Sequence, residues 1–343
     1  MKPLLPIDYD FILNRLETDF KAQSGSHWFI TGATGLFGKW FLETLLESNK
    51  KFNTKFRITA LSRDPERFKI TMPHLGNHQD LQWIRGDVSS FVFPKEPMDF
   101  MIHAAAEIQN SNTDVPSKVF EQQLEATKHF IEFCQVNSKA KVLFTSSGAV
   151  YGQIPSDMTH VPETYLGAPD VSKHNAAYGE AKRVSELLFH CAKLEFDLDF
   201  KISRTFAVLG AHLPLDSHFA IGNFIGQAMQ QKPIQILSDG TPTRSYLYMA
   251  EHTVWLFKIL FHGESTRAYN VGSDNSRSIL ETAQAVSREF QDFSIEVAQP
   301  PQPNKTISRY VPSIERIKTE LGLNIEIPLQ EAIKRTLHWW QTI

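Results

Sequence analysis

Tyr178 and Lys182 stand four positions apart in the segment YGEAK and form the pair of side chains best suited to proton transfer. On a helix, residues four apart share a face, which places the lysine ammonium beside the phenol. A nearby cation favours the phenolate, so we expect Lys182 to lower the pKa of Tyr178 from its ordinary value of about 10 toward neutral pH. Such a tyrosine can exchange a proton with an alcohol or sugar hydroxyl. The alternative interpretation is a surface tyrosine with a lysine one turn away.

A glycine-rich turn, TGATGLFG at 31–38, joins the apolar run HWFIT to the helix-like segment KWFLETLLES. Its glycines, Gly32, Gly35 and Gly38, have the spacing GxxGxxG. In a dinucleotide-binding turn, the first glycine permits the bend, the second lets backbone N–H groups approach a pyrophosphate, and the third lets helix and strand pack closely. The phosphates then lie at the helix N-terminus. Because this turn occupies the first strand-to-helix junction, we expect it to bind a dinucleotide rather than to be only a structural turn.

Strand-like and helix-like segments alternate from this turn onward. Apolar runs rich in β-formers predict buried strands at FRITALS, LQWIRGD, MDFMIHAAA and KVLFTSS, and helical periodicity predicts a helix over VFEQQLEATKHFIEFCQ. Strands that are apolar on both faces and alternate with helices predict a parallel sheet covered by helices on both sides. The predicted fold is therefore an α/β, Rossmann-type, doubly wound parallel sheet with a smaller C-terminal substrate-binding lobe.

Changes in composition predict three parts of the chain. An amphipathic helix over 7–20 precedes a polar stretch, and the sequence becomes rich in proline and glycine after about 207. The expected parts are an N-terminal helical appendage at 1–25, a dinucleotide-binding domain at 26–206, and a mainly substrate-binding lobe at 207–343, from which 251–272 can return to the dinucleotide-binding domain.

The second strand-like run ends in ALSRDPER, where the residue types bear on the choice of cofactor. An acid at this place usually binds the ribose 2′-hydroxyl of NAD, whereas an arginine accommodates the 2′-phosphate of NADP. Ser62 and Arg63 therefore predict that NADP is the preferred cofactor. NAD is the alternative, with Arg63 in solvent and Asp64 on the ribose.

The overall composition argues against several other classes of protein. The formal net charge of −3 predicts no nucleic-acid partner, and no apolar stretch approaches the roughly 20 residues of a membrane span. Acids at Asp8, Asp10 and Glu17 argue against a secretion signal. The only cysteines, Cys134 and Cys191, are far apart and predict buried small hydrophobes in a reducing cytoplasm, with no metal site.

Six segments follow one another along the chain in a recognisable order. They are TGATGLFG, GDV at 86–88, HAAA at 103–106, SSGAVYG at 146–152, YGEAK at 178–182 and DGTPTRSYLY at 239–248. Together they resemble the extended short-chain dehydrogenase/reductase family, the NAD(P)-dependent epimerases, dehydratases and reductases of nucleotide-sugars. The similarity covers roughly residues 26–340.

The resemblance implies roles for individual positions. Ser147 would hydrogen-bond the reacting oxygen, Tyr178 would be the acid/base, and Lys182 would bind the nicotinamide ribose while tuning Tyr178. Asp87 would contact the adenine. The glycine turn and the resemblance together predict these cofactor-binding residues: Gly32, Thr34, Gly35, Leu36, Phe37, Gly38, Ser62, Arg63, Asp87, Val88, Ala104, Ala105, Ala106, Tyr178 and Lys182.

The predicted substrate-binding residues are Ser147, Gly148, Ala149 and Arg244. Arg244 matches an arginine that in such enzymes grips the nucleotide diphosphate, a task suited to a guanidinium fork, although a surface arginine is the alternative. Dehydratases of the family carry Asp and Glu at the two positions after the catalytic hydroxyl, and decarboxylases carry a glutamate in this stretch. Because Gly148 and Ala149 stand there instead, we expect neither elimination of water nor decarboxylation.

The resulting hypothesis is a cytoplasmic, NADP-dependent reductase of carbohydrate biosynthesis that acts on a 4-keto nucleotide-sugar, with Tyr178 as proton donor. A nucleotide-sugar 4-epimerase that retains NAD is the main alternative, because it would use the same three residues. A reductase of a non-sugar ketone and a non-catalytic dinucleotide sensor are further alternatives. We also expect a homodimer formed partly by the apolar segment 184–196, whose burial within one chain is the other explanation.

Overall fold

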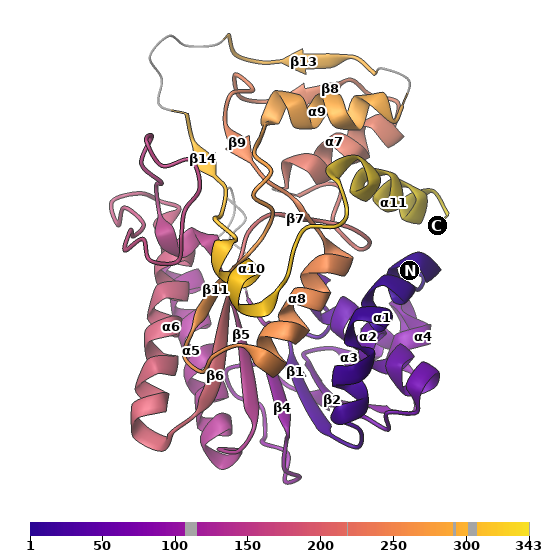
Figure 1. Ribbon diagram of the computed structural model, residues 1–343, viewed down its shortest axis with the longest axis vertical. Helices are drawn as coiled ribbons and strands as arrows, with labels where there is room; N and C mark the ends of the chain where they lie inside the picture. Colours follow the sequence, from indigo (N-terminus) through magenta and orange to yellow (C-terminus); the bar gives the residue numbers. More distant parts are fainter. Residues whose placement is uncertain (107–114, 218, 291–292, 301–306, 343) are drawn as a thin grey trace.

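Seven parallel strands form the main sheet of the computed structural model, in the order β11-β6-β5-β4-β1-β2-β3. Their bounds are β1 His27–Thr31, β2 Arg57–Ser62, β3 Leu81–Arg85, β4 Phe100–His103, β5 Lys141–Ser147, β6 Asp199–Thr205 and β11 Ala268–Val271. The order reverses between β1 and β4, and doubly wound sheets bind ligands at the carboxyl ends of the strands at such a reversal. The structure describes residues 1–106, 115–217, 219–290, 293–300 and 307–342 (Figure 1).

Helices cover both faces of this sheet (Figure 1). The helices on one face are α1 Pro6–Ala22, α2 Leu36–Phe52 and α8 Met249–His262, and those on the other are α5 Pro116–Val136 and α6 Ala176–Phe196. Successive side chains of β1 point to opposite faces, so Trp28 packs with the first group of helices and Phe29 with the second. The short helices α3 Pro65–Thr71 and α4 Pro73–Gly76 connect β2 to β3. The predicted Rossmann-type α/β fold is confirmed.

The expectation that each of these strands is apolar on both faces is wrong for β3. Of its five residues only Leu81 is buried. β3 is less buried because it is an edge strand of the sheet and has a neighbouring strand on one side only. Trp83 is half-buried there, and its indole N–H donates a hydrogen bond of 3.0 Å to the Gly76 carbonyl of α4.

The chain after β6 builds a smaller unit, which lies above the main sheet in the view of Figure 1. Its strands form small sheets: β12 Arg277–Ser278 with β9 Thr243–Arg244 and β14 Arg309–Tyr310, β13 Ile295–Val297 with β8 Ile234–Ile236, and β10 Leu247–Tyr248 with β7 Val208–Leu209. Its helices are α7 Ala220–Met229, α9 Ile279–Arg288 and α11 Leu329–Gln341, whereas α10 Glu315–Leu321 packs against β11 and α8. Within this stretch α8 and β11 belong to the main sheet and its cover.

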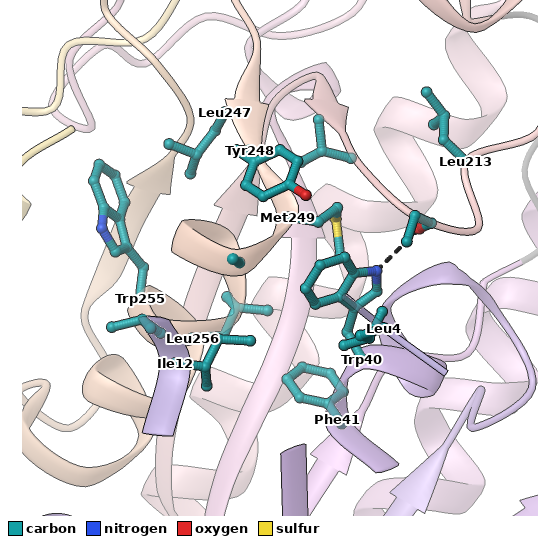
Figure 2. Packing of buried hydrophobic residues seen from close by; sticks show 14 of the residues in the cluster. Leu4, Ile12, Trp40, Phe41, Leu213, Leu247, Tyr248, Met249, Trp255 and Leu256 are labelled. Carbon is teal, nitrogen blue, oxygen red and sulfur yellow. Dashed lines mark hydrogen bonds between the residues drawn. The ribbon is translucent and has the colours of Figure 1, made fainter. Parts of the chain in front are cut away.

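The N-terminal helix α1 is part of the main core rather than a detached element. Ile12 and Phe20 are fully buried, and the Phe20 ring makes an edge-to-face contact with Phe257 of α8 at 5.1 Å between centroids. Figure 2 shows Ile12 in the same apolar cluster as Trp40 of α2, whose indole N–H donates a hydrogen bond of 3.0 Å to the Ala211 carbonyl. The cluster therefore joins α1 and the main sheet to the start of the smaller unit.

The two cysteines lie on the helices of the other face. Cys134 on α5 is buried, and burial raises the pKa of its thiol well above the ordinary value. Cys191 on α6 is only partly buried, so the prediction that both are buried is wrong for this residue. On α6 the neighbouring residue Ala192 faces the core, so Cys191 lies on a part of the helix surface that is less covered.

The longest helices, α5 and α6, each have 21 residues and carry charged side chains along their length. In the part of the chain that the structure describes, none of the helices combines the length and the apolarity needed to cross a bilayer.

Candidate active site

The glycine turn joins β1 to α2 and lies tightly against the end of β4. Gly32 has a left-handed φ of +66°, and a Cβ there would lie 2.5 Å from the carbonyl carbon of Ala104. A Cβ on Gly38 would lie 2.3 Å from the carbonyl oxygen of Gly32. Both positions therefore require glycine. The turn brings the N-terminus of α2, with its unpaired N–H groups, to the carboxyl edge of the sheet, where a phosphate can bind.

A cavity of about 430 Å³ opens beside this turn. The predicted cofactor-binding residues that line it are Gly32, Thr34, Gly35, Ser62, Arg63, Asp87, Val88, Ala104, Ala105 and Ala106. Its wall also contains Leu61, Gly86, Ser89, Gln122, Gln123, Glu125 and Ala126. The volume is in the range of small-ligand sites, and Gln123 Oε1 is a buried acceptor without a hydrogen-bond partner among the described residues. These features fit a dinucleotide.

Five predicted cofactor-binding residues lie outside the lining of this cavity. Leu36 and Gly38 pack behind the turn, and the Phe37 ring lies 4.5 Å from the imidazole of His252 on α8. Tyr178 and Lys182 lie on α6, beside β5. The two residues predicted for proton transfer therefore lie outside the cavity beside the glycine turn.

A larger hollow, about 760 Å³, lies at the opposite, amino end of the sheet. Its lining includes His27 and Arg57 at the starts of β1 and β2 and Asn53 after α2, and it contains none of the predicted site residues. Size alone therefore does not identify the site. The smaller cavity is the candidate because the glycine turn and the strand reversal meet there.

Asp87 occupies the far wall of the smaller cavity. Its carboxylate accepts hydrogen bonds from the Ser89 N–H at 3.0 Å and the Ser89 hydroxyl at 2.7 Å. These bonds, with a smaller contribution from Arg63, lower the pKa of Asp87 below its ordinary value. The carboxylate is therefore ionised at neutral pH and oriented as a hydrogen-bond acceptor.

Arg63 and Asp64, which follow β2, differ in whether they line the cavity. Arg63 is exposed and lines the cavity together with Ser62. Asp64 is outside the lining, and its carboxylate accepts a hydrogen bond of 3.1 Å from the Arg67 N–H as the N-cap of α3. An N-cap carboxylate is committed to the helix terminus, so the acid at this place is occupied by local structure.

Ser147 and Tyr178 come together where β5 ends and α6 begins. Ser147 is the last residue of β5, and its hydroxyl accepts a hydrogen bond of 3.1 Å from the Ala149 N–H and lies beside the Tyr178 phenol. Lys182 follows one turn along α6, is buried, and donates a hydrogen bond of 2.9 Å to the Thr145 carbonyl. The three residues predicted to act in catalysis therefore lie on one strand end and one adjoining helix face.

The expectation that Lys182 lowers the pKa of Tyr178 is wrong. Burial raises the pKa of Tyr178, and the neighbouring Ser147 hydroxyl, rather than the charge of Lys182, acts to lower it. The Lys182 ammonium is directed toward the Thr145 carbonyl and lies 4.8 Å from the centre of the Phe144 ring. Burial also lowers the pKa of Lys182 to about 7, so the lysine is only partly charged at neutral pH.

A second tyrosine, Tyr310, reaches the same hydroxyl and was missed by the sequence reasoning. It lies on β14 of the smaller unit, places its phenol beside the Ser147 hydroxyl, and packs its ring 4.6 Å from Phe206. Burial raises its pKa, so the phenol stays protonated at neutral pH. No local pattern could have found Tyr310, because its place depends on the pairing of β14 with β9.

Gly148 has no room for a side chain. A Cβ there would lie 2.7 Å from the Phe206 ring and 2.8 Å from the Tyr310 hydroxyl. Ala149 follows on the short helical turn η1 Gly148–Tyr151 and is partly exposed. The geometry therefore excludes a carboxylate at position 148 unless Phe206 or Tyr310 moves.

Arg244 connects the smaller unit to this region. On β9 it is paired with Tyr310 on β14 and with Arg277 on β12. Its guanidinium donates a hydrogen bond of 2.8 Å to the Thr243 carbonyl and lies 5.9 Å from the centre of the Tyr310 ring. Because the Tyr310 phenol lies beside Ser147, Arg244 is within two side chains of the Ser147 hydroxyl.

His103 is buried at the end of β4, and burial keeps its pKa well below the ordinary value. Its Nδ1 hydrogen-bonds with the Thr31 hydroxyl at 2.9 Å, whereas Nε2 has no partner among the described residues. Across those same residues, nowhere do three or more His, Cys, Asp or Glu side chains converge in a way that could hold a metal ion.

The sheet order, the glycine turn and the adjoining cavity define a Rossmann-type dinucleotide-binding protein. Residues 28–272 match the NAD dependent epimerase/dehydratase family, and the chain belongs to that family. Among its relatives, UDP-glucuronic acid decarboxylase 5 of Arabidopsis thaliana is 24% identical over 313 residues, which cover 91% of this chain and 88% of that protein. UDP-glucuronic acid decarboxylase 1 of Danio rerio is 23% identical over 317 residues, which cover 91% of this chain and 72% of that protein.

Solved structures share the fold at low sequence identity. UDP-N-acetylglucosamine 4-epimerase of Methanobrevibacter ruminantium, in complex with UDP-N-acetylmuramic acid, has a TM-score of 0.80 and 20% identity, covering 93% of this chain and 99% of that chain. UDP-glucuronic acid 4-epimerase of Bacillus cereus, in complex with NAD, has a TM-score of 0.77 and 20% identity, covering 92% of this chain and 99% of that chain.

Proposed function

We propose that the protein reduces a 4-keto nucleotide-sugar with NADPH, using Tyr178 as the proton donor. The observation that carries this proposal is the placement of the Tyr178 phenol beside the Ser147 hydroxyl at the end of β5, with Lys182 buried one turn further along α6. A phenol paired with a hydroxyl beside a dinucleotide cavity is an arrangement for proton transfer to an oxygen at the carbon that receives hydride.

Each of the three side chains has a distinct task in this reaction. NADPH, when bound, would supply the hydride. Ser147 donates a hydrogen bond to the substrate carbonyl oxygen, without losing its proton, and so stabilises the negative charge that develops there. Tyr178 gives that oxygen its proton, and burial, which raises the pKa of Tyr178, keeps the phenol protonated until then. Lys182, held by the Thr145 carbonyl, supplies a positive charge beside the phenolate that remains.

The same site argues against elimination of water and against decarboxylation. By the family resemblance, both reactions need a carboxylate next to the catalytic hydroxyl. This chain has Gly148 and Ala149 at those positions. Gly148 is also closed to a larger side chain by Phe206 and Tyr310. This supports a reaction other than the one named for the decarboxylase relatives.

NADP is the proposed cofactor because of the side chains at the end of β2 and directly after it. Arg63 and Ser62 line the cavity, whereas the carboxylate of Asp64 caps α3 and is engaged by the Arg67 N–H. A 2′-phosphate would meet a guanidinium and a hydroxyl there, which suits NADP better than the 2′-hydroxyl of NAD.

The substrate is proposed to be a nucleotide-sugar because of Arg244. Its guanidinium lies near Tyr310, and so near Ser147, and β12 places Arg277 beside it on the same small sheet. Two arginines on adjacent strands can bind a diphosphate. The UDP compound in the Methanobrevibacter ruminantium 4-epimerase structure is a ligand of this chemical class.

A 4-epimerase that retains NAD is the second candidate. It would use Ser147, Tyr178 and Lys182 in the same way but return the hydride to the opposite face of the same sugar. Its support is the similarity to two named 4-epimerases, one of them in complex with NAD.

We also propose a homodimer in which α6 takes part. Leu187 and Leu194, within the segment 184–196, are 59% and 88% exposed on one chain. Light scattering would give twice the chain mass of 39.1 kDa if the dimer forms, and Leu187→Glu with Leu194→Glu would reduce it to a single chain. A wild-type mass of one chain would contradict the dimer.

The cofactor content of the purified protein tests the choice between reductase and epimerase. Freshly purified protein is denatured, released nucleotides are identified by mass spectrometry, and the emptied protein is titrated with NADPH and NADH. A reductase should release little nucleotide and bind NADPH reversibly and more tightly than NADH. Stoichiometric NAD that resists dialysis would favour the epimerase and contradict the proposed role of Arg63.

A further inference from the structure

Three consecutive residues of β5 hold three residues of α6 that are spaced one turn apart. The Tyr178 phenol lies beside the Ser147 hydroxyl, the Thr145 carbonyl accepts from Lys182 at 2.9 Å, and the Ser146 hydroxyl donates to Glu186 at 2.6 Å. Residues four apart on a helix share a face, so Tyr178, Lys182 and Glu186 form one row against the strand. Only the first two members of this row are used in the proposed reaction.

Glu186 is buried, and both of its carboxylate oxygens have partners. Oε1 accepts from the Ser146 hydroxyl and from Arg204 Nε at 3.1 Å, and Oε2 accepts from an Arg204 terminal nitrogen at 2.7 Å. Arg204 lies on β6, next to β5, and its other terminal nitrogen donates to the Tyr151 hydroxyl at 3.0 Å. The carboxylate is thus fixed in position by two strands.

Lys182 is the residue that this fixed negative charge affects. Burial lowers its pKa to about 7, and the charge of Glu186 acts in the opposite direction. Without that charge the buried ammonium would lose its proton at a lower pH. The proposed reaction needs the ammonium, because a neutral lysine cannot stabilise the phenolate of Tyr178.

Other groups face Lys182 and Glu186 from the neighbouring elements. His103 of β4 is buried, and the charge of Lys182 helps to lower its pKa, so the imidazole is neutral. Arg204 of β6 is paired with Glu186. Tyr151 of η1 has its pKa raised by burial to about 12 and is also neutral at pH 7. Glu186 is therefore the acid that opposes the loss of the Lys182 proton.

We propose that Glu186 is a positioning residue for the reaction, which holds the Lys182 ammonium in its charged form and fixes the register of α6 against β5 through Ser146 and Arg204. The proposal rests on the proposed function in one respect, that a charged Lys182 is needed for turnover. The effect on Lys182 itself does not depend on which substrate is used.

The test measures the protonation of Lys182 in the full-length protein. Protein labelled with carbon-13 at the lysine ε-carbon is titrated by NMR, and the Lys182 signal is assigned by its loss in Lys182→Met. In Glu186→Gln we expect the pKa of Lys182 to fall by about one unit or more. With a 4-keto nucleotide-sugar and NADPH, the alkaline limb of the rate profile should move to lower pH by the same amount. Glu186→Asp, which keeps the charge, should restore much of the Lys182 pKa and of the position of the alkaline limb.

Two further variants keep this test decisive. Glu195→Gln removes the same charge from an exposed position on the same helix and should leave the Lys182 titration unchanged. If Glu186→Gln fails to fold because Arg204 is left unpaired, Arg204→Met is used instead: it removes the cation paired with Glu186, so the carboxylate should act more strongly on Lys182 and raise its pKa. A folded variant in which Lys182 titrates as in the wild type would overturn the proposal. Absence of turnover by the wild type would instead contradict the proposed function, because the titration needs no substrate.

Discussion

Two phenols, those of Tyr178 and Tyr310, lie beside the Ser147 hydroxyl, one from α6 and one from β14. Tyr178 lies one turn from Lys182, whereas the cation near Tyr310 is Arg244, which the proposed function assigns to the diphosphate of the substrate. We therefore assign the proton transfer to Tyr178 and regard Tyr310 as a neutral neighbour that comes with the smaller unit.

Tyr178→Phe should lower turnover by about 100-fold or more, the usual contribution of a general acid. The dissociation constant for NADPH should change little, because the dinucleotide cavity does not include this side chain. Steady-state rates and fluorescence titration measure the two effects. Tyr165→Phe, in the loop before α6, is the control and should leave turnover unchanged. Full turnover by Tyr178→Phe would favour a non-catalytic sensor.

Arg63→Ala should weaken NADPH binding about tenfold, the size of one charge-assisted hydrogen bond, and should leave NADH binding nearly unchanged. The physical reason is that only NADPH carries the 2′-phosphate. Arg57→Ala, an exposed arginine at the amino end of the same strand, is the matched control. Equal losses for the two nucleotides would contradict the proposed phosphate contact.

Gly148→Ala should lower the free energy of unfolding by about 1 to 3 kcal/mol, the usual cost of inserting atoms into a packed site. The new Cβ would lie 2.7 Å from the Phe206 ring. Phe206→Leu in the same chain creates space and should restore part of the loss, which a double-mutant cycle in urea measures. Additive losses from the two changes would show that the ring is not the obstacle.

The turn between β1 and α2 allows a comparison of two glycines only three positions apart. In Gly38→Ala the Cβ would meet the Gly32 carbonyl oxygen at 2.3 Å, so α2 must shift away from β1 and dinucleotide binding should be lost. In Gly35→Ala the nearest protein atom is that same oxygen at 3.2 Å, so α2 should keep its place and the free energy of unfolding should fall far less than in Gly38→Ala. Urea unfolding of both variants measures the difference. Equal losses of stability would contradict the packing role of Gly38.

Elements formed by neighbouring residues were predictable from the sequence. The turn at Gly32 follows from local glycine spacing, and the buried strands follow from short apolar runs, because a strand covered on both faces excludes polar side chains. Most of the predicted cofactor-binding residues accordingly line one cavity. The partial exposure of β3 was not predictable in this way, because a run of five residues does not reveal that the strand lies at an edge.

Contacts between distant segments could not be predicted. Tyr310 reaches Ser147 only because β14 pairs with β9, and each of these strands has two residues, too few to show a periodic pattern. The direction of the Tyr178 pKa shift also depends on burial, which the spacing of Tyr178 and Lys182 does not specify.

Helix α1 ties the two ends of the chain together. The Asp8 carboxylate accepts a hydrogen bond of 2.8 Å from the Tyr248 hydroxyl of β10 and one of 3.3 Å from Arg335 of α11. The Trp339 indole of α11 donates to the Pro3 carbonyl at 2.9 Å. Since β10 follows the strand that carries Arg244, the N-terminal segment supports the smaller unit as well as the main sheet.

Asp8 should make the stability of the whole molecule depend on pH. Burial raises its pKa from 3.8 to about 6, so the folded state binds this proton more tightly than the unfolded state does. The free energy of unfolding should therefore decrease as pH rises from about 4 to about 6. Asp8→Asn removes this pH dependence. In urea unfolding, the free energy of unfolding of the variant should therefore increase relative to that of the wild type as the pH rises from about 4 to about 6. Asp10→Asn, exposed on the same helix, should show no such shift.

Transfer of a labelled hydride tests the central claim most directly. The protein is incubated with a 4-keto nucleotide-sugar and NADPH that carries deuterium in the transferable position, and the product is analysed by NMR and mass spectrometry. The account predicts consumption of one NADPH per product molecule, with deuterium at C4 of the sugar, and a large loss of this reaction in Tyr178→Phe. Interconversion of two 4-hydroxy nucleotide-sugars without net consumption of nucleotide or uptake of deuterium would contradict it.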